Sequence, residues 1–166
     1  MQNHYSYTFD IRSETYSFTT KNKIIYKVAF LVDESFTAIS GEEIPNVFQL
    51  IVEKTTDEIE PFDASVSKTI EHIVEKFFHK TENSLIYICS EANDKAKLRH
   101  EIFNRWYQNS RYKTFIVKLD NVISITINTT ETQKLYTSFL FHKQNSNFKR
   151  LIEIYTQIEE TLNEEK

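Results

Sequence analysis

Polar and hydrophobic residues alternate along the first third of the chain, a pattern typical of β-strands with one buried face. Tyr5, Tyr7 and Phe9 begin this alternation, which continues to Val52. It predicts four strands, at residues 5–11, 16–20, 24–32 and 47–52. The breaks between the first three strands are short enough for hairpins, so we expect an antiparallel meander with an exposed edge strand.

The apolar spacing changes to every third or fourth residue in three later segments, which predicts amphipathic helices. These helices cover about residues 65–79, 94–109 and 147–162. Asp63 or Ser65 is a suitable N-cap for the first helix. Between the first two helices, the apolar run at 84–89 is typical of a central strand that is covered on both faces.

Three more strands are expected after the second helix, at residues 115–119, 122–127 and 135–142. Asp120 and Asn121 stand between the first two of these and predict a turn, since Asn and Asp tolerate a positive φ. A run of strands followed by alternating strands and helices indicates an α+β fold. We expect one domain over residues 1–166, with three helices packed on a largely antiparallel mixed sheet of about six to eight strands.

Composition places the chain among ordinary globular proteins. Hydrophobic residues make up 40% of it and charged residues 27%, which is enough apolar material for one core. The single cysteine, Cys89, rules out an internal disulfide and fits a reducing compartment. No apolar run is long enough to span a bilayer, and the first residues show no secretion signal. We therefore expect a cytoplasmic protein that does not enter the membrane.

Charge and glycine content argue against several kinds of site. The net charge of −4 is unlike that of a nucleic-acid binder, which usually carries a basic excess. Gly41 is the only glycine, so no glycine-rich phosphate loop or dinucleotide motif can be written. The histidines show no metal-ligand spacing, and no serine has the glycine-flanked turn of a nucleophile elbow. We name no catalytic residue and expect no metal and no cofactor.

The turn after the central strand is the best candidate for a binding or catalytic site. Glu91, Asp94, Lys95 and Arg99 cluster there, and Trp106 follows on the same helix. Unpaired N–H groups at a helix start favour anions, so Arg99 could clamp an anion, with Asp94 as acid/base or metal ligand. In the simpler interpretation, which we favour, Asp94 is an N-cap and Arg99 is a structural clamp, partly buried against rings and paired with a carboxylate.

The segment 85–89, followed by Asp94, Arg99, Phe103 and Trp106, resembles a family of small uncharacterised bacterial proteins. Their shared pattern is an apolar strand ending in Ile-Cys, an acidic turn, and a helix with arginine, phenylalanine and tryptophan. This chain has a serine at position 90, where the family usually has aspartate, and no glycine in the turn. The resemblance implies a fold and a domain of unknown function, without an activity.

The order of elements also resembles the core of acyl-CoA-dependent N-acetyltransferases. In that family, a glycine-containing loop before the first of these helices holds the pyrophosphate through backbone N–H groups. The matching stretch, residues 55–62, has no glycine and carries Asp57, Glu58 and Glu60, which would repel a phosphate. The likeness therefore implies a related, degenerate fold. The missing glycine and the carboxylates in this stretch argue against acetyl transfer.

Two functional hypotheses follow from these observations. The first is a non-enzymatic intracellular interaction or binding protein, acting as a homodimer or with a protein partner. The aromatic-rich sheet, its exposed edge strand and the missing catalytic spacings favour it. The alternative is an anion- or nucleotide-binding module, or an enzyme, that uses the turn from Glu91 to Arg99.

Overall fold

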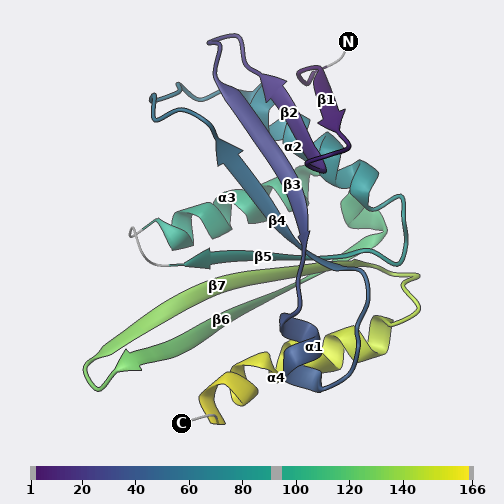
Figure 1. Cartoon of the computed structure of the whole chain (residues 1–166), viewed down its shortest axis with the longest axis vertical. Helices are drawn as coiled ribbons and strands as arrows, with labels where there is room; N and C mark the ends of the chain where they lie inside the picture. The colour runs from purple at the N-terminus through teal and green to yellow at the C-terminus, as the bar shows by residue number, and fades with distance from the viewer. Residues whose placement is uncertain (1–2, 91–94, 165–166) are drawn as a thin grey trace. The chain divides into compact units, whose positions relative to one another are not determined.

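The computed structural model describes residues 3–90 and 95–164 and confirms the predicted α+β fold (Figure 1). A seven-stranded, mostly antiparallel sheet has the order β1-β2-β3-β4-β5-β7-β6, in which β4 and β5 run parallel. The chain divides into two compact units, residues 1–31 with 50–80 and residues 32–49 with 81–166. We describe each unit in turn, and the prediction of a single domain over the whole chain stays a prediction.

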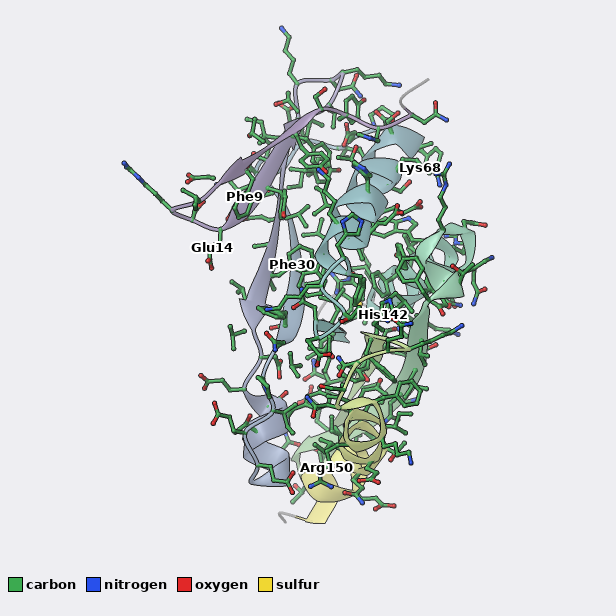
Figure 2. The ribbon with its side chains drawn as sticks, turned by 90° about the vertical axis from the view of Figure 1, so that its right-hand side faces the viewer. Phe9, Glu14, Phe30, Lys68, His142 and Arg150 are labelled. Atoms are coloured by element: carbon green, nitrogen blue, oxygen red, sulfur yellow. The ribbon has the colours of Figure 1, made fainter. Side chains whose placement is uncertain are left out.

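The first unit is an antiparallel meander covered on one face by a helix. Its elements are β1 (Tyr7–Asp10), β2 (Thr15–Thr19), β3 (Ile25–Val32) and α2 (Ala64–Phe77), together with the end of β4 (Val47–Lys54). The register pairs Tyr7 with Phe18 and Phe18 with Tyr26, so aromatic rings line one face. Phe30 stacks on Phe77 of α2 with ring centroids 4.1 Å apart, and Figure 2 shows Phe30 between β3 and that helix. The meander therefore buries its aromatic face against α2.

Helix α2 begins as its sequence predicts. Asp63 is the N-cap, and its Oδ1 accepts a hydrogen bond of 2.9 Å from the Ser65 backbone N–H. The side chains of Ile70, Ile73 and Val74 are buried on the inner stripe of the helix. An N-cap at Asp63 and a 3.6-residue apolar period thus account for both its start and its orientation.

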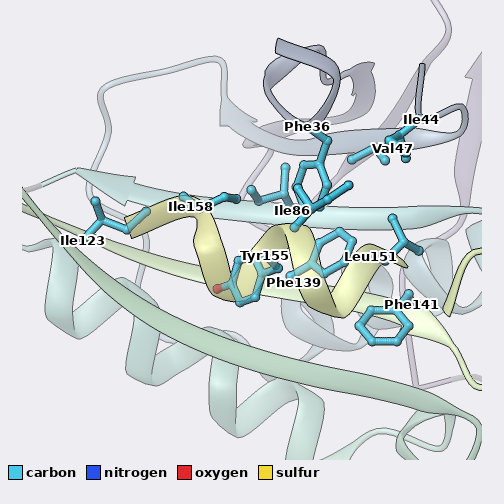
Figure 3. Close-up of a cluster of buried hydrophobic side chains, with 11 residues drawn as sticks. Phe36, Ile44, Val47, Ile86, Ile123, Phe139, Phe141, Leu151, Tyr155 and Ile158 are labelled. Carbon is cyan, nitrogen blue, oxygen red and sulfur yellow. The ribbon is translucent and has the colours of Figure 1, made fainter. Parts of the chain in front are cut away.

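The second unit packs helices on both faces of a four-strand segment. Its elements are α1 (Ser35–Ser40), the start of β4, β5 (Ser84–Ser90), α3 (Ala96–Asn109), a 3-10 turn (Tyr112–Thr114), β6 (Ile116–Asn128), β7 (Glu131–His142) and α4 (Phe148–Glu164). Figure 3 shows the buried cluster formed where α4 and α1 cover one face of these strands. Its members are Phe36, Ile44, Val47, Ile86, Ile123, Phe139, Phe141, Leu151, Ile154, Tyr155 and Ile158. This cluster is the main core of the unit.

Helix α3 contributes to the opposite face of β5 and β7. Phe103 packs on Tyr87 of β5 with ring centroids 4.3 Å apart. Tyr87 is aligned across the strands with Ser138 of β7, which is in turn aligned with Asp120 of β6. Because neighbouring partners in a sheet point to the same side, these three side chains share the α3 face.

Two expectations about the elements are wrong, and one short helix was not predicted. β6 is one continuous strand, and the expected turn at Asp120 and Asn121 lies inside it. The helical spacing of Leu98 relative to Ile102, Phe103 and Trp106 predicts that it lies on the inner stripe of α3, but it is 52% exposed. The short helix α1 was not predicted, and it ends at Gly41 with a φ of 67°. No helix among the described residues is long and apolar enough to cross a bilayer.

Candidate functional site

Helix α3 carries part of the site predicted from the sequence. It begins at Ala96, and Lys95 in the capping position makes no side-chain capping hydrogen bond. Lys95 and Arg99 are exposed, whereas Trp106 is half-buried with its ring centroid 6.4 Å from that of Phe103. The start of α3 therefore offers cations to solvent, and its aromatic residues belong to the packing below.

The acidic half of the predicted site precedes helix α3 in the sequence. Glu91 and Asp94 lie outside the described residues. The expected pairing of Arg99 with Glu91 or Asp94 therefore stays a prediction. The same is true of an anion or nucleotide site at this turn.

Arg99 is exposed rather than partly buried. Its positive charge lowers the pKa of two residues of β5, Tyr87 and Cys89. Burial raises the pKa of the Cys89 thiol, while a hydrogen bond with Tyr87 and the charge of Arg99 lower it. Burial also raises the pKa of Tyr87 well above its usual value. Cys89 is 2% exposed, and a buried thiol with a raised pKa is a poor nucleophile. Cys89 is thus placed as a packing residue.

A polar cluster lies beside α3 on β6 and β7. The Ser138 hydroxyl donates a 2.7 Å hydrogen bond to Asp120 Oδ1 and lies 3.4 Å from His100 Nδ1. The Lys118 ammonium pairs with the same Asp120 oxygen, and His100 Nε2 lies 3.8 Å from it. The Lys118 side chain is only 3% exposed, whereas that of Asp120 is 46% exposed. Asp120 therefore gathers three polar partners at the margin of the sheet.

This cluster contains the residue types of a catalytic triad without its geometry. In a triad, histidine lies between serine and carboxylate, so that it can take the serine proton. Here Ser138 hydrogen-bonds Asp120 directly, and Ser138 is 0% exposed, so no substrate can reach its oxygen. The arrangement satisfies buried polar groups next to α3 and is structural in character.

Two partly buried histidines predict a pH dependence of stability. Burial lowers the pKa of His100, with Asp120 raising it and Lys118 lowering it; burial, His4 and Lys76 lower that of His72. In the unfolded chain both imidazoles take a proton at about pH 6.5. The folded state takes it only at lower pH, so stability is highest above that pH and declines as the pH falls below it.

We expect the free energy of unfolding to fall between about pH 7.5 and 5.5, and the double variant His72→Gln/His100→Gln to flatten this decline. Urea unfolding at several pH values in this window measures the slope. An equally steep decline in the double variant would show that these two side chains are not its source.

The segment between β4 and α2, residues 55–62, is tied to the first unit at its start and its middle; we call it the acidic loop. The Thr55 backbone N–H donates a 3.0 Å hydrogen bond to the Ile25 carbonyl of β3. The Tyr26 hydroxyl donates a 2.8 Å hydrogen bond to Glu60 Oε2. These contacts give the loop a defined conformation on the end of the meander.

The residue that follows the acidic loop is held more firmly still. Asp63 accepts a 2.5 Å hydrogen bond from the Tyr5 hydroxyl in addition to its capping bond with Ser65. The bond from Tyr5 lowers the pKa of Asp63, partly offset by burial, and the Ser65 N–H lowers it further. Its side chain is only 6% exposed. The ionised form of Asp63 is therefore stabilised where the acidic loop joins helix α2.

Burial along this segment is the reverse of the usual pattern. Ile59 and Phe62 are 95% and 93% exposed. By contrast, the carboxylates of Glu60 and Asp63 turn inward to tyrosine hydroxyls. Single exposed apolar residues are common, but here two almost fully exposed ones lie three positions apart beside carboxylates that face inward.

The sequence showed the negative charge of this segment but did not show which of its side chains face inward. The tyrosines that draw Glu60 and Asp63 inward lie 34 and 58 residues away along the chain. The one local signal was the insertion of Ile59 and Phe62 among carboxylates, on both sides of Pro61. Such a mixture has no strand or helix period and would have justified attention as a binding segment.

Comparison with known proteins places the chain in a family. Residues 62–157 match DUF6169, described as a family of unknown function, and this match covers more than half of the chain. The chain belongs to DUF6169. The match agrees with the predicted membership of a family without an assigned activity, and the DUF6169 region includes α2, α3 and β5 to β7. No curated protein and no solved structure matches the chain, so the likeness to acetyltransferases gains no support. Among the described residues, no group of three or more potential metal-ligating side chains is present.

Proposed function

We propose that this DUF6169 protein is a non-enzymatic binding module that docks a protein partner through the acidic loop. One observation carries the proposal: Ile59 and Phe62 are almost fully exposed while the neighbouring carboxylates face inward. Folding has fixed the loop without covering these two side chains. A partner surface would cover them.

The two apolar side chains can supply much of a binding energy. Burying an isoleucine or phenylalanine that was exposed contributes about 1.5–3 kcal/mol each. Because hydrogen bonds to Tyr26 and the β3 backbone already order the loop, less conformational entropy is lost on binding than for a free peptide. A preordered pair of apolar anchors is the arrangement found at the centre of many protein interfaces.

The charge around these anchors indicates the kind of partner. Asp57 and Glu58 are exposed beside Ile59, and residues 55–62 contain no lysine or arginine. A complementary surface would have apolar pockets with a rim of lysine or arginine. The same charges oppose binding to anionic lipids or to nucleic-acid phosphates.

Removing both anchors should abolish partner capture and leave the fold intact. We expect a tagged wild-type chain, purified from its native host, to retain a partner that the double variant Ile59→Ser/Phe62→Ser loses. Ile11→Ser is the matched control, since it removes an apolar side chain that is 82% exposed outside the loop. It should retain the partner. Mass spectrometry of the co-purified proteins and thermal melting of each variant are the measurements.

The outcome that counts against the proposal is equally definite. If the double variant captures the same proteins as wild type and Ile11→Ser, the acidic loop is not the docking segment. If the double variant does lose the partner, a charge-reversal variant, Asp57→Lys/Glu58→Lys, separates the contribution of the charges from that of the apolar anchors. It should weaken capture if the partner has a basic rim and leave it unchanged if only the apolar anchors matter.

A further inference from the structure

Strand β6 forms one end of the strand order, and half of its backbone groups point away from the sheet. The Lys143 N–H donates to the Phe115 carbonyl at 2.9 Å, which fixes the phase of the antiparallel ladder between β7 and β6. With the register of Asp120 against Ser138 and Val122 against Tyr136, the N–H and C=O groups of Asp120, Val122 and Ser124 face outward. Among the described strands, only β7 pairs with β6.

Proteins usually protect such an edge with short strands, charges or proline. The opposite end of the order follows this rule, since β1 has only four residues and ends at Asp10. β6 has 13 residues, and its second part, residues 121–128, contains no charge, no proline and no glycine. The charged residues of its first part, Lys118 and Asp120, pair with each other.

We propose that β6 pairs with the β6 strand of a second copy of this chain, joining the two sheets across a two-fold axis. Antiparallel pairing around Val122 would place Asp120 opposite Ser124 and Lys118 opposite Thr126, so no like charges meet. Val122, which is 43% exposed, would be covered by its own equivalent. A self-complementary edge fits a second copy because a two-fold interface places the same strand on both sides.

This surface belongs to the second unit and does not depend on the acidic loop. The inference therefore goes beyond the proposed partner docking and can fail without it. The two can also be distinguished directly, since Ile59→Ser/Phe62→Ser should leave self-association unchanged.

Ser124→Pro tests the edge with little effect on β7 pairing. Proline removes the outward N–H of residue 124 and is tolerated on edge strands, while Ser124→Ala keeps that N–H. Sedimentation velocity over a range of protein concentrations should show a dimer for wild type and Ser124→Ala. We expect the dissociation constant of Ser124→Pro to rise roughly tenfold to a hundredfold, because each copy loses a hydrogen bond across the axis.

Val122→Lys provides a second test if the proline variant does not fold, as judged by circular dichroism. It places two ammonium groups next to each other at the axis, so a folded monomer is expected. A wild type that stays monomeric at all concentrations overturns the inference. So does a dimer that Val122→Lys leaves intact, or one that is lost only in the acidic-loop variant.

Discussion

Phe139→Ala is expected to lower the free energy of unfolding by about 3–5 kcal/mol, the largest effect of any single change considered. Phe139 is 0% exposed in the middle of β7. Its ring centroid lies 4.7 Å from that of Phe36 and 5.3 Å from that of Tyr155, so it joins α1 and α4 to the sheet. Truncation removes these contacts and leaves a cavity that rigid neighbouring strands cannot fill.

Urea unfolding followed by circular dichroism measures this loss. Leu31→Ala is the control, because it also shortens a strand residue, but one that is 54% exposed. Its effect should stay within about 0.5 kcal/mol. A loss below about 1 kcal/mol for Phe139→Ala would mean that the α4 face of β7 is not a packed core.

Asn145→Ala should have the second-largest effect, a loss of about 1–3 kcal/mol. Asn145 is 5% exposed and fixes the entry to α4. Its Nδ2 donates to the Glu82 carbonyl at 3.1 Å and to Ser84 Oγ at 3.3 Å, and its Oδ1 accepts from the Asn147 N–H at 2.8 Å. Alanine leaves the buried Ser84 hydroxyl and the partly buried groups of Glu82 and Asn147 without these hydrogen bonds.

Chemical denaturation again provides the measurement, with Ser146→Ala as the neighbouring control. Ser146 is exposed and its hydroxyl donates to the Glu82 carboxylate, so its removal should cost much less. Asn145→Asp keeps the acceptor and loses the donors, and should lie between the two. Equal stability of Asn145→Ala and Ser146→Ala would contradict a structural role for the buried amide.

Periodicity predicted the main elements because each has a single buried stripe or face. Helix α2 and its cap Asp63 are examples, since both depend on residues a few positions apart. The error at Asp120 and Asn121 has a tertiary cause. The Asp120 carboxylate is satisfied by Ser138 and Lys118, and the Asn121 carbonyl accepts from Thr137, so a pair that suggests a turn fits inside a strand. Helix α1 has only six residues, too few to show a period.

Less of the functional surface could be predicted. The chemistry-rich turn at Glu91 to Arg99 attracted attention because charged residues cluster there, yet Arg99 is exposed and its expected partners lie outside the described residues. The acidic loop was noted only for its charge. That Ile59 faces out and Glu60 faces in depends on Tyr26, a contact between distant parts of the sequence that local patterns do not contain.

Site-specific photo-cross-linking tests the docking role of the acidic loop most directly. A benzophenone amino acid is placed at Phe62 and, in a separate chain, at the exposed strand residue Leu31, and both are irradiated in cells of the native host. The account predicts a discrete protein adduct from position 62 and none from position 31. No adduct at position 62, or the same adducts from both positions, would contradict it.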